Sequence, residues 1–143
     1  MDMALEEARK AVALGEVPVG ALIVAPDGRI LARAGNAVER RHDPTAHAEV
    51  LAIREACARL DNWRLSGCVL VVTLEPCAMC AAAIVHARLA GVVYGAADDA
   101  AGAVISRAEY LDAPVSTTPV WHMGGVRARE CAALLRECFE ARR

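Results

Sequence analysis

The chain has 143 residues and a net charge of −2 at pH 7, with 16 Lys and Arg against 18 Asp and Glu. This balance does not indicate a basic nucleic-acid-binding domain, although local patches can still contact phosphates. Hydrophobic residues make up 56% but aromatic residues only 3%, which predicts a core of small aliphatic side chains. No apolar run reaches the roughly 18 residues of a membrane span. Six cysteines in a chain with a full core favour a reduced, cytoplasmic protein over a disulfide framework.

The first half of the chain predicts a helix, a β-hairpin and a second helix. Apolar residues recur at helical spacing over residues 3–14, and Gly15 ends that helix. Two aliphatic runs within residues 17–35 flank a Pro-Asp-Gly turn at 26–28, which is typical of a hairpin. A polar stretch then leads to a helix over residues 44–59.

The second half of the chain alternates short apolar strands with helices. The expected elements are strands at 68–74 and 91–95, a helix at 76–89 that is apolar nearly all round, a short helix at 106–111, a strand near 115–121 and a helix at 127–141. With the hairpin this gives five strands, joined by short connections without a linker or a repeat. We therefore expect one domain over residues 1–143, an α/β protein of three layers, α/β/α, with a five-stranded mixed sheet.

Two short strings carry metal-binding residue types, and each stands at the start of a predicted helix. The first, Pro-Thr-Ala-His-Ala-Glu at 44–49, contains His47, and the second, Glu-Pro-Cys-Ala-Met-Cys at 75–80, contains Cys77 and Cys80. In both strings proline is expected at the first helical position, where its missing N–H costs nothing. The two cysteines then lie on the first turn of their helix. One nitrogen and two sulfurs are a normal zinc set, and three protein ligands leave the fourth position open for water, as in catalytic sites.

Glu49 is the candidate proton carrier. Two thiolates neutralise the zinc charge and acidify its water less than an all-histidine set, so a nearby base must take the proton. Residues two apart on a regular helix point in roughly opposite directions, so His47 and Glu49 can share a cavity only if His47 lies in an irregular entry turn. The alternative is a structural zinc with a fourth protein ligand, for which His42, Cys57 and Cys68 are candidates. A structural site needs neither Glu49 nor the proline before the cysteine pair, whereas a catalytic site uses both.

The His-x-Glu…Pro-Cys-x-x-Cys arrangement is typical of zinc-dependent nucleobase deaminases. Beyond this signature, the chain resembles the bacterial tRNA-specific adenosine deaminases over nearly its whole length. The matching strings lie at 16–21, 41–49, 72–77, 94–96, 130–135 and 142–143. The second and third of these are shared with guanine and cytosine deaminases, whereas the first and fifth point more narrowly to the tRNA enzymes.

The resemblance implies a cytidine deaminase-like fold, a homodimer and hydrolysis of adenosine to inosine at the wobble position of tRNA anticodons. In such an enzyme a zinc-bound water attacks the base and Glu49 moves the protons. By the same resemblance, Asn36 would hydrogen-bond the flipped base, Val19 would line its pocket and Asp98 would meet the backbone of the anticodon loop. Two of these residues have ordinary alternatives, Asn36 as the turn residue that ends the hairpin and Asp98 as a solvated loop carboxylate.

Three departures from the family pattern concern expected RNA contacts and leave the zinc strings intact. The loop at 98–101 reads Asp-Asp-Ala-Ala without the usual lysine, the turn at 102–105 lacks its second glycine and its serine, and Cys138 replaces the first of two phenylalanines. The alternative function is therefore a free nucleobase or nucleoside deaminase of the guanine or cytosine type.

Two further interpretations concern RNA binding. A catalytically idle RNA-binding protein could keep the zinc for stability, but the presence of Glu49 argues against it. The best candidate for a cationic RNA contact is the terminal helix with Arg142 and Arg143, unless its arginines only pair with neighbouring glutamates.

Overall fold

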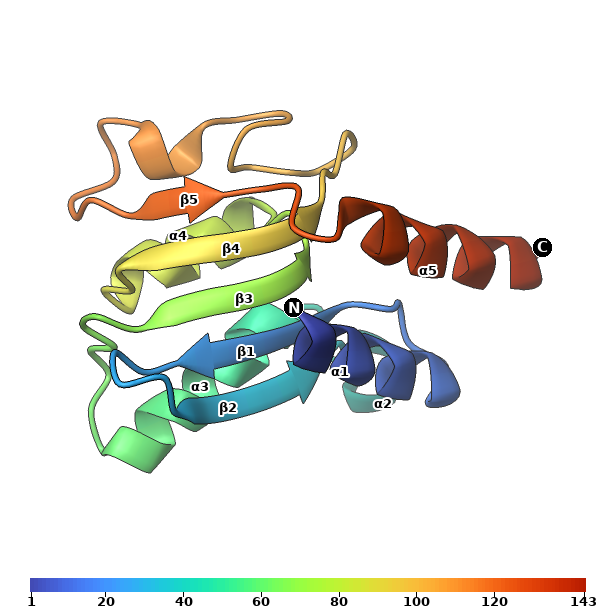
Figure 1. Ribbon diagram of the computed structural model, residues 1–143, viewed down its shortest axis with the longest axis horizontal. Helices are drawn as coiled ribbons and strands as arrows, with labels where there is room; N and C mark the ends of the chain where they lie inside the picture. The colour runs from blue at the N-terminus through green and yellow to red at the C-terminus, as the bar shows by residue number, and fades with distance from the viewer.

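Five strands form one mixed sheet in the computed structural model, which describes residues 1–143 (Figure 1). They are β1 (Gly20–Val24), β2 (Ile30–Gly35), β3 (Val69–Leu74), β4 (Gly91–Ala96) and β5 (Trp121–Met123). Their order across the sheet is β2-β1-β3-β4-β5. β1 runs antiparallel to both β2 and β3, whereas β4 runs parallel to β3 and β5. The predicted five-stranded mixed sheet is thus confirmed.

Helices cover both faces of this sheet and give the predicted three layers. α1 (Asp2–Ala13) and α5 (Ala128–Ala141) lie on one face, and α3 (Ala48–Leu60) and α4 (Ala78–His86) lie on the other (Figure 1). The single-turn helix α2 (Val38–Arg41) and the 3₁₀ turn η1 (Tyr110–Asp112) lie in connections. No helix combines the length and the apolar character that crossing a membrane would require.

Small residues let the helices pack closely against the sheet. Ala48, Ala52 and Ala56 recur four residues apart on α3 and are fully buried, so a stripe of alanine faces the strands. On the opposite face, a Cβ atom added to Gly20 of β1 would lie 2.0 Å from the carbonyl oxygen of Ala4 in α1. Only glycine allows so close an approach of helix and strand.

The predicted helix over 44–59 begins four residues later than expected, and a short helix precedes it. α2 occupies residues 38–41, in the stretch predicted to be irregular. Asp43 then accepts hydrogen bonds from the backbone N–H and the hydroxyl of Thr45, at 2.8 and 2.7 Å. This local bonding fixes a turn in place of a first helical turn, so the prediction that Pro44 occupies the first helical position is wrong.

The predicted helix at 106–111 is reduced to the 3₁₀ turn η1, and the strand predicted near 115–121 lies instead at residues 121–123, as β5. The first is cut short because the backbone N–H of Tyr110, which a helix would direct to the carbonyl of Ser106, donates instead to the carbonyl of Ala103 at 3.0 Å. In the second, Pro119 has no N–H to give to a strand ladder. The remaining predicted elements agree with the structure to within a few residues.

Candidate metal centre and active-site pocket

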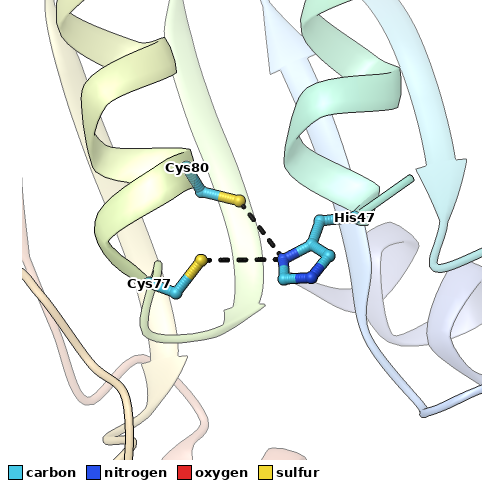
Figure 2. A group of neighbouring side chains, drawn as sticks. All are labelled: His47, Cys77 and Cys80. Carbon is cyan, nitrogen blue, oxygen red and sulfur yellow. Dashed lines mark hydrogen bonds between the residues drawn. The ribbon is translucent and has the colours of Figure 1, made fainter. Parts of the chain in front are cut away.

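α3 and α4 begin in the same way, with a candidate ligand at the N-cap. His47 (φ −68°, ψ 149°) and Cys77 (φ −74°, ψ 175°) both have extended backbone, and neither side chain caps its helix. Cys80 lies on the first turn of α4. The prediction that both cysteines lie on that turn is therefore wrong for Cys77, which is the N-cap, and the prediction that Pro76 takes the first helical position is wrong because it precedes the N-cap. Since the N-cap side chains are not used for capping, they are free to face each other between the two helices (Figure 2).

The three side chains converge on one point. The Nδ1 atom of His47 lies 3.7 Å from the Cys77 sulfur and 3.5 Å from the Cys80 sulfur, and all three atoms lie within 4.8 Å of one another (Figure 2). A tetrahedral zinc with bonds of about 2.3 Å to sulfur and about 2.0 Å to nitrogen would hold such atoms roughly 3.6 Å apart. The three residues therefore fit zinc. The side chains considered as a fourth ligand do not belong to this group, namely His42, Cys57 and Cys68.

The charges of these side chains also favour a divalent cation. A hydrogen bond with Cys80, opposed by burial and assisted by His47, lowers the pKa of the Cys77 thiol to about 4. The same hydrogen bond, together with burial, raises the pKa of Cys80, and the bond to Cys77 raises the pKa of His47. The close approach of the two sulfurs and the imidazole thus favours the thiolate of Cys77 over that of Cys80. A bound cation is what would accommodate both as thiolates, and imidazole with two thiolates is a set that zinc accepts.

Glu49 lies on the first turn of α3 and is only 4% exposed. Because His47 stands before the helix in extended backbone and Glu49 stands within it, both side chains line the same cavity. The irregular entry turn that their spacing requires is therefore present. Burial raises the pKa of Glu49 to about 7. A carboxyl group suited to taking up and releasing a proton thus lies beside the metal ligands.

A cavity of about 310 Å³ lies where β3 and β4 end and where α3 and α4 begin. The carboxyl ends of parallel strands are the usual ligand-binding edge of such sheets. All the predicted site residues but one line this cavity: Val19, Asn36, His47, Glu49, Cys77 and Asp98. The exception is Cys80, which is buried beside it. The lining residues that the sequence analysis did not identify are Val17, Val38, Glu39, Leu74, Glu75 and Ala101.

The loop after β4 forms one wall of the cavity and is held in place by Glu75, which is 1% exposed. One carboxylate oxygen accepts from the backbone N–H groups of Val104, Ile105 and Ser106 at 3.2, 2.8 and 2.9 Å. The other accepts from the Asp98 N–H at 3.0 Å and from the Ser106 hydroxyl. Burial raises the pKa of Glu75, but the Ser106 hydroxyl and these N–H groups outweigh it and lower the pKa to about 2. This carboxylate therefore holds the loop after β4 against the start of α4.

Asn36 and Asp98 differ in how far the protein itself uses their side chains. Asn36 is 7% exposed, and its side-chain N–H donates a hydrogen bond to the Glu16 carboxylate at 3.2 Å. It is therefore a buried, hydrogen-bonded residue and not an exposed turn residue. One carboxylate oxygen of Asp98 accepts from the N–H groups of Ala100 and Ala101, at 3.0 and 3.1 Å. Asp98 thus stabilises its own loop while it lines the cavity.

Comparison with known proteins places these features in a family context. Residues 1–96 match the cytidine and deoxycytidylate deaminase zinc-binding region. The chain is similar to the tRNA-specific adenosine deaminase of Aquifex aeolicus, with 47% identity over 98% of this chain and 91% of that protein. It is similar, with a TM-score of 0.91 and 46% identity over 94% of this chain and 97% of the other, to a structure from a study of A-to-I editing by tRNA:A34 deaminases at the wobble position of transfer RNA. A guanine deaminase from Nitrosomonas europaea is similar with a TM-score of 0.79 and 27% identity, over 96% of this chain and 81% of the other.

Proposed function

This chain belongs to the tRNA-specific adenosine deaminases, within the zinc-binding cytidine and deoxycytidylate deaminases, and we propose that it converts adenosine to inosine at the wobble position of a tRNA anticodon. The observation that carries the proposal is the similarity over nearly the whole chain, at 46–47% identity, to proteins named for that activity. The likeness to a guanine deaminase is lower in both identity and TM-score. A free base is therefore the second candidate substrate.

The proposed reaction adds water to the base, breaks the bond between C6 and the exocyclic nitrogen, and releases ammonia. His47, Cys77 and Cys80 would hold the zinc, which when bound supplies Lewis-acid activation of water near neutral pH. Glu49 would take one proton from the attacking water and give it to the base, then pass a second proton to the leaving amine. Its buried position beside the three ligands supports this role.

Three further residues of the cavity would hold the substrate. A nucleotide must leave the stack of the anticodon loop to enter such a cavity. Val19 offers it an apolar wall and Asn36 a hydrogen-bonding amide. Asp98, on the partly exposed loop after β4, can accept a hydrogen bond from a ribose 2′-hydroxyl of a flanking nucleotide. A tRNA substrate would also place the protein in the cytoplasm.

The function can be tested by comparing substrates under one set of conditions. We would incubate the zinc-loaded protein with an anticodon stem-loop that carries adenosine at the wobble position, with the same stem-loop carrying it at a neighbouring loop position, and with free adenosine, guanine and cytosine. We expect inosine in the first RNA and little or none elsewhere. Faster release of xanthine from guanine, or of uracil from cytosine, would overturn the RNA assignment in favour of a free-base enzyme.

We further propose that the protein is a homodimer that pairs through α3 and α4. A largely apolar groove of about 290 Å³ separates these helices on their outer side, and Trp63, Ala83 and His86 line it. Trp63 is 53% exposed, and His86 is exposed on α4. A second copy is the occupant that the family resemblance implies. Such a contact would lie on the helix whose start carries Cys77 and Cys80.

The dimer can be tested by sedimentation at micromolar concentration. We expect the unsubstituted protein to sediment as a dimer and the Ala83→Arg variant as a monomer, because a charge in the groove cannot be buried without a partner. Ala58→Arg, an exposed position on α3 outside the groove, is the matched control and should stay dimeric. A monomeric unsubstituted protein would contradict the proposal.

A further inference from the structure

Glu16 is a buried carboxylate at the edge of the pocket for which the reaction gives no role. It lies between α1 and β1, and its side chain is fully buried at 0% exposure. It accepts three hydrogen bonds, from Asn36 Nδ2 at 3.2 Å, from the Glu39 N–H at 3.2 Å and from the Arg40 N–H at 2.8 Å. A buried carboxylate is costly unless such donors compensate it. The contacts made by Glu16 therefore define what it does in the fold.

Two of the three contacts fix the position of α2. Glu39 and Arg40 are the second and third residues of this helix, and their N–H groups are among those that no helical carbonyl can satisfy. The N-cap residue, Ala37, has no side-chain oxygen to offer them. Glu16 accepts these hydrogen bonds in place of an N-cap side chain, although it lies 23 and 24 residues away in the sequence. Since Val38 and Glu39 line the cavity, Glu16 holds that wall in place.

The third contact decides which way the Asn36 amide faces. A carboxylate offers only acceptors, so the amide must turn its nitrogen to Glu16 and its oxygen away. The structure gives the Asn36 amide oxygen no partner, yet no buried side-chain oxygen or nitrogen in the chain lacks one. This oxygen is therefore open to the cavity that Asn36 lines. Without Glu16, either edge of the amide could face the same space.

From these contacts we infer that Glu16 is a positioning residue, which sets the amide of Asn36 in one orientation so that the pocket presents a single hydrogen-bonding pattern to the nucleoside. One amide hydrogen is committed to Glu16, and the oxygen and the second hydrogen remain for the substrate. That the substrate is an adenosine rests on the proposed function, whereas the pairing of Glu16 with Asn36 does not. Glu16 acts on the hydrogen bonding of the base through Asn36 and on the α2 wall through its other two contacts, so only the first effect is coupled to Asn36.

The pairing can be measured directly in the unsubstituted protein. Asn36 and Asn62 are the only carboxamide side chains in the sequence, so a nitrogen-15 spectrum contains two side-chain NH₂ groups, and Asn62 is exposed. We expect one Asn36 amide hydrogen to exchange with solvent about tenfold more slowly than its geminal partner and than both Asn62 hydrogens. The difference between the two Asn36 hydrogens should disappear in Glu16→Ala. Two Asn36 hydrogens that exchange equally fast in the unsubstituted protein would overturn the inference.

The consequence for the reaction is tested by a double-mutant cycle on the wobble stem-loop. Glu16→Gln can offer Asn36 either a donor or an acceptor, so we expect kcat/KM to fall about tenfold or more, with the zinc content unchanged. In the Asn36→Ala background the same change should cost clearly less, about threefold at most, because only the contacts of Glu16 with α2 are then disturbed. An equal loss in both backgrounds would show that Glu16 acts on the fold alone and would overturn the inference.

A matched control separates this effect from the loss of any buried glutamate. Glu7 lies on α1, is 9% exposed and pairs with Lys10 and Arg33 at a distance from the cavity lining. Glu7→Gln should lower stability and leave kcat/KM unchanged. If the unsubstituted protein leaves the stem-loop unmodified, the proposed function fails, and the exchange measurement still decides whether Glu16 orients Asn36. The same measurement decides the case if Glu16→Gln does not fold.

Discussion

The metal centre and the walls of the same pocket are built in different ways. The start of a helix places each metal ligand, with His47 and Cys77 at the N-caps of α3 and α4 and Cys80 on the turn that follows. The walls depend on two buried carboxylates with distant partners. Glu16 receives donors from 20–24 residues away, and Glu75 receives donors from 23–31 residues away.

This difference separates two kinds of failure. A change in a metal ligand should remove the ion and with it the chemistry, because three protein ligands leave no spare donor. A change in a buried carboxylate should leave the ion in place and disturb the surfaces that meet the substrate. Substitutions at the metal ligands, at Glu49, at the Glu75 wall and at the C-terminal arginines can break or sharpen this contrast, with effects on activity that decrease in that order.

The largest effect is expected from Cys80→Ala. Loss of one of three ligands should abolish stoichiometric zinc binding, and deamination of the stem-loop should fall to the level of a zinc-free blank. Zinc is measured by metal analysis of the purified protein and activity by inosine formation. Cys68→Ala is the matched control, since Cys68 is also a buried free thiol but lies outside the ligand group. It should keep both zinc and activity, and a Cys80→Ala protein with one zinc per chain would refute the ligand assignment.

Glu49→Gln should cost about 10²–10⁴-fold in kcat, the usual contribution of a general acid–base group. The zinc content and the melting temperature should stay close to those of the parent, because Glu49 is not among the three ligands. The comparison variant is Glu55→Gln, an exposed position on the same helix, which should behave as the parent does. Turnover within a few-fold of the parent would show that another group carries the protons.

The contrast between metal centre and walls also explains which features of the structure could be predicted from the sequence. The grouping of the candidate ligands with Glu49 could be predicted because these residues lie in two short strings whose spacing is itself the signal. The first four strands and the four longer helices could be predicted because their apolar residues recur with the period of the element or form a continuous run, whereas the fifth strand, expected near 115–121, lies at 121–123. Neither inference needs knowledge of how distant segments meet.

The errors have the opposite character. The sequence predicts only a polar connection where α2 forms. This short helix forms because Glu16, a residue from another segment, accepts hydrogen bonds from the N–H groups at its N-terminal end. The helix expected at 106–111 is reduced to η1, because the N–H of Tyr110 donates to the carbonyl of Ala103, outside that segment, and not to the carbonyl of Ser106. Propensity and periodicity describe local preferences, so they do not register hydrogen-bond partners that lie outside the segment. For the same reason, Val38 and Glu39 of α2 could not be predicted as pocket residues.

The third prediction concerns the wall that Glu75 holds. Glu75→Gln removes a charged acceptor from several N–H groups, which should lower stability by about 2–3 kcal/mol and the melting temperature by roughly 8 °C. We expect KM for the stem-loop to rise about tenfold while zinc content is kept, because the wall moves and the ligands do not.

Gly102→Ala should act in the same direction, since its new Cβ would lie 2.4 Å from the Glu75 carboxylate. Glu109→Gln, in the exposed part of the connection, is the control. A loss of zinc in Glu75→Gln would show that wall and metal centre are not separable.

The smallest effect on activity is expected from the arginines at the C-terminal end, because one of the two candidate RNA contacts is already hydrogen-bonded within the protein. Arg142 donates to the carbonyl of Gly15 at 2.6 Å, whereas the Arg143 side chain is exposed at the end of the chain. α5 extends past the edge of the sheet at which β3 and β4 end, which is the edge that carries the pocket (Figure 1). We expect Arg142→Ala with Arg143→Ala to raise KM for the stem-loop about two- to threefold at low salt, and to reduce the salt slope by about one for each phosphate that the arginines neutralise in the parent. Turnover at saturation should not change, because these arginines act on binding alone.

Arg29→Ala, which removes a cation paired with Asp27 at the hairpin turn, is the control and should leave the salt slope unaltered. If the double variant has the parent's KM and slope, the C-terminal arginines lie outside the RNA site, and the groups that hold the anticodon loop must come from elsewhere around the pocket.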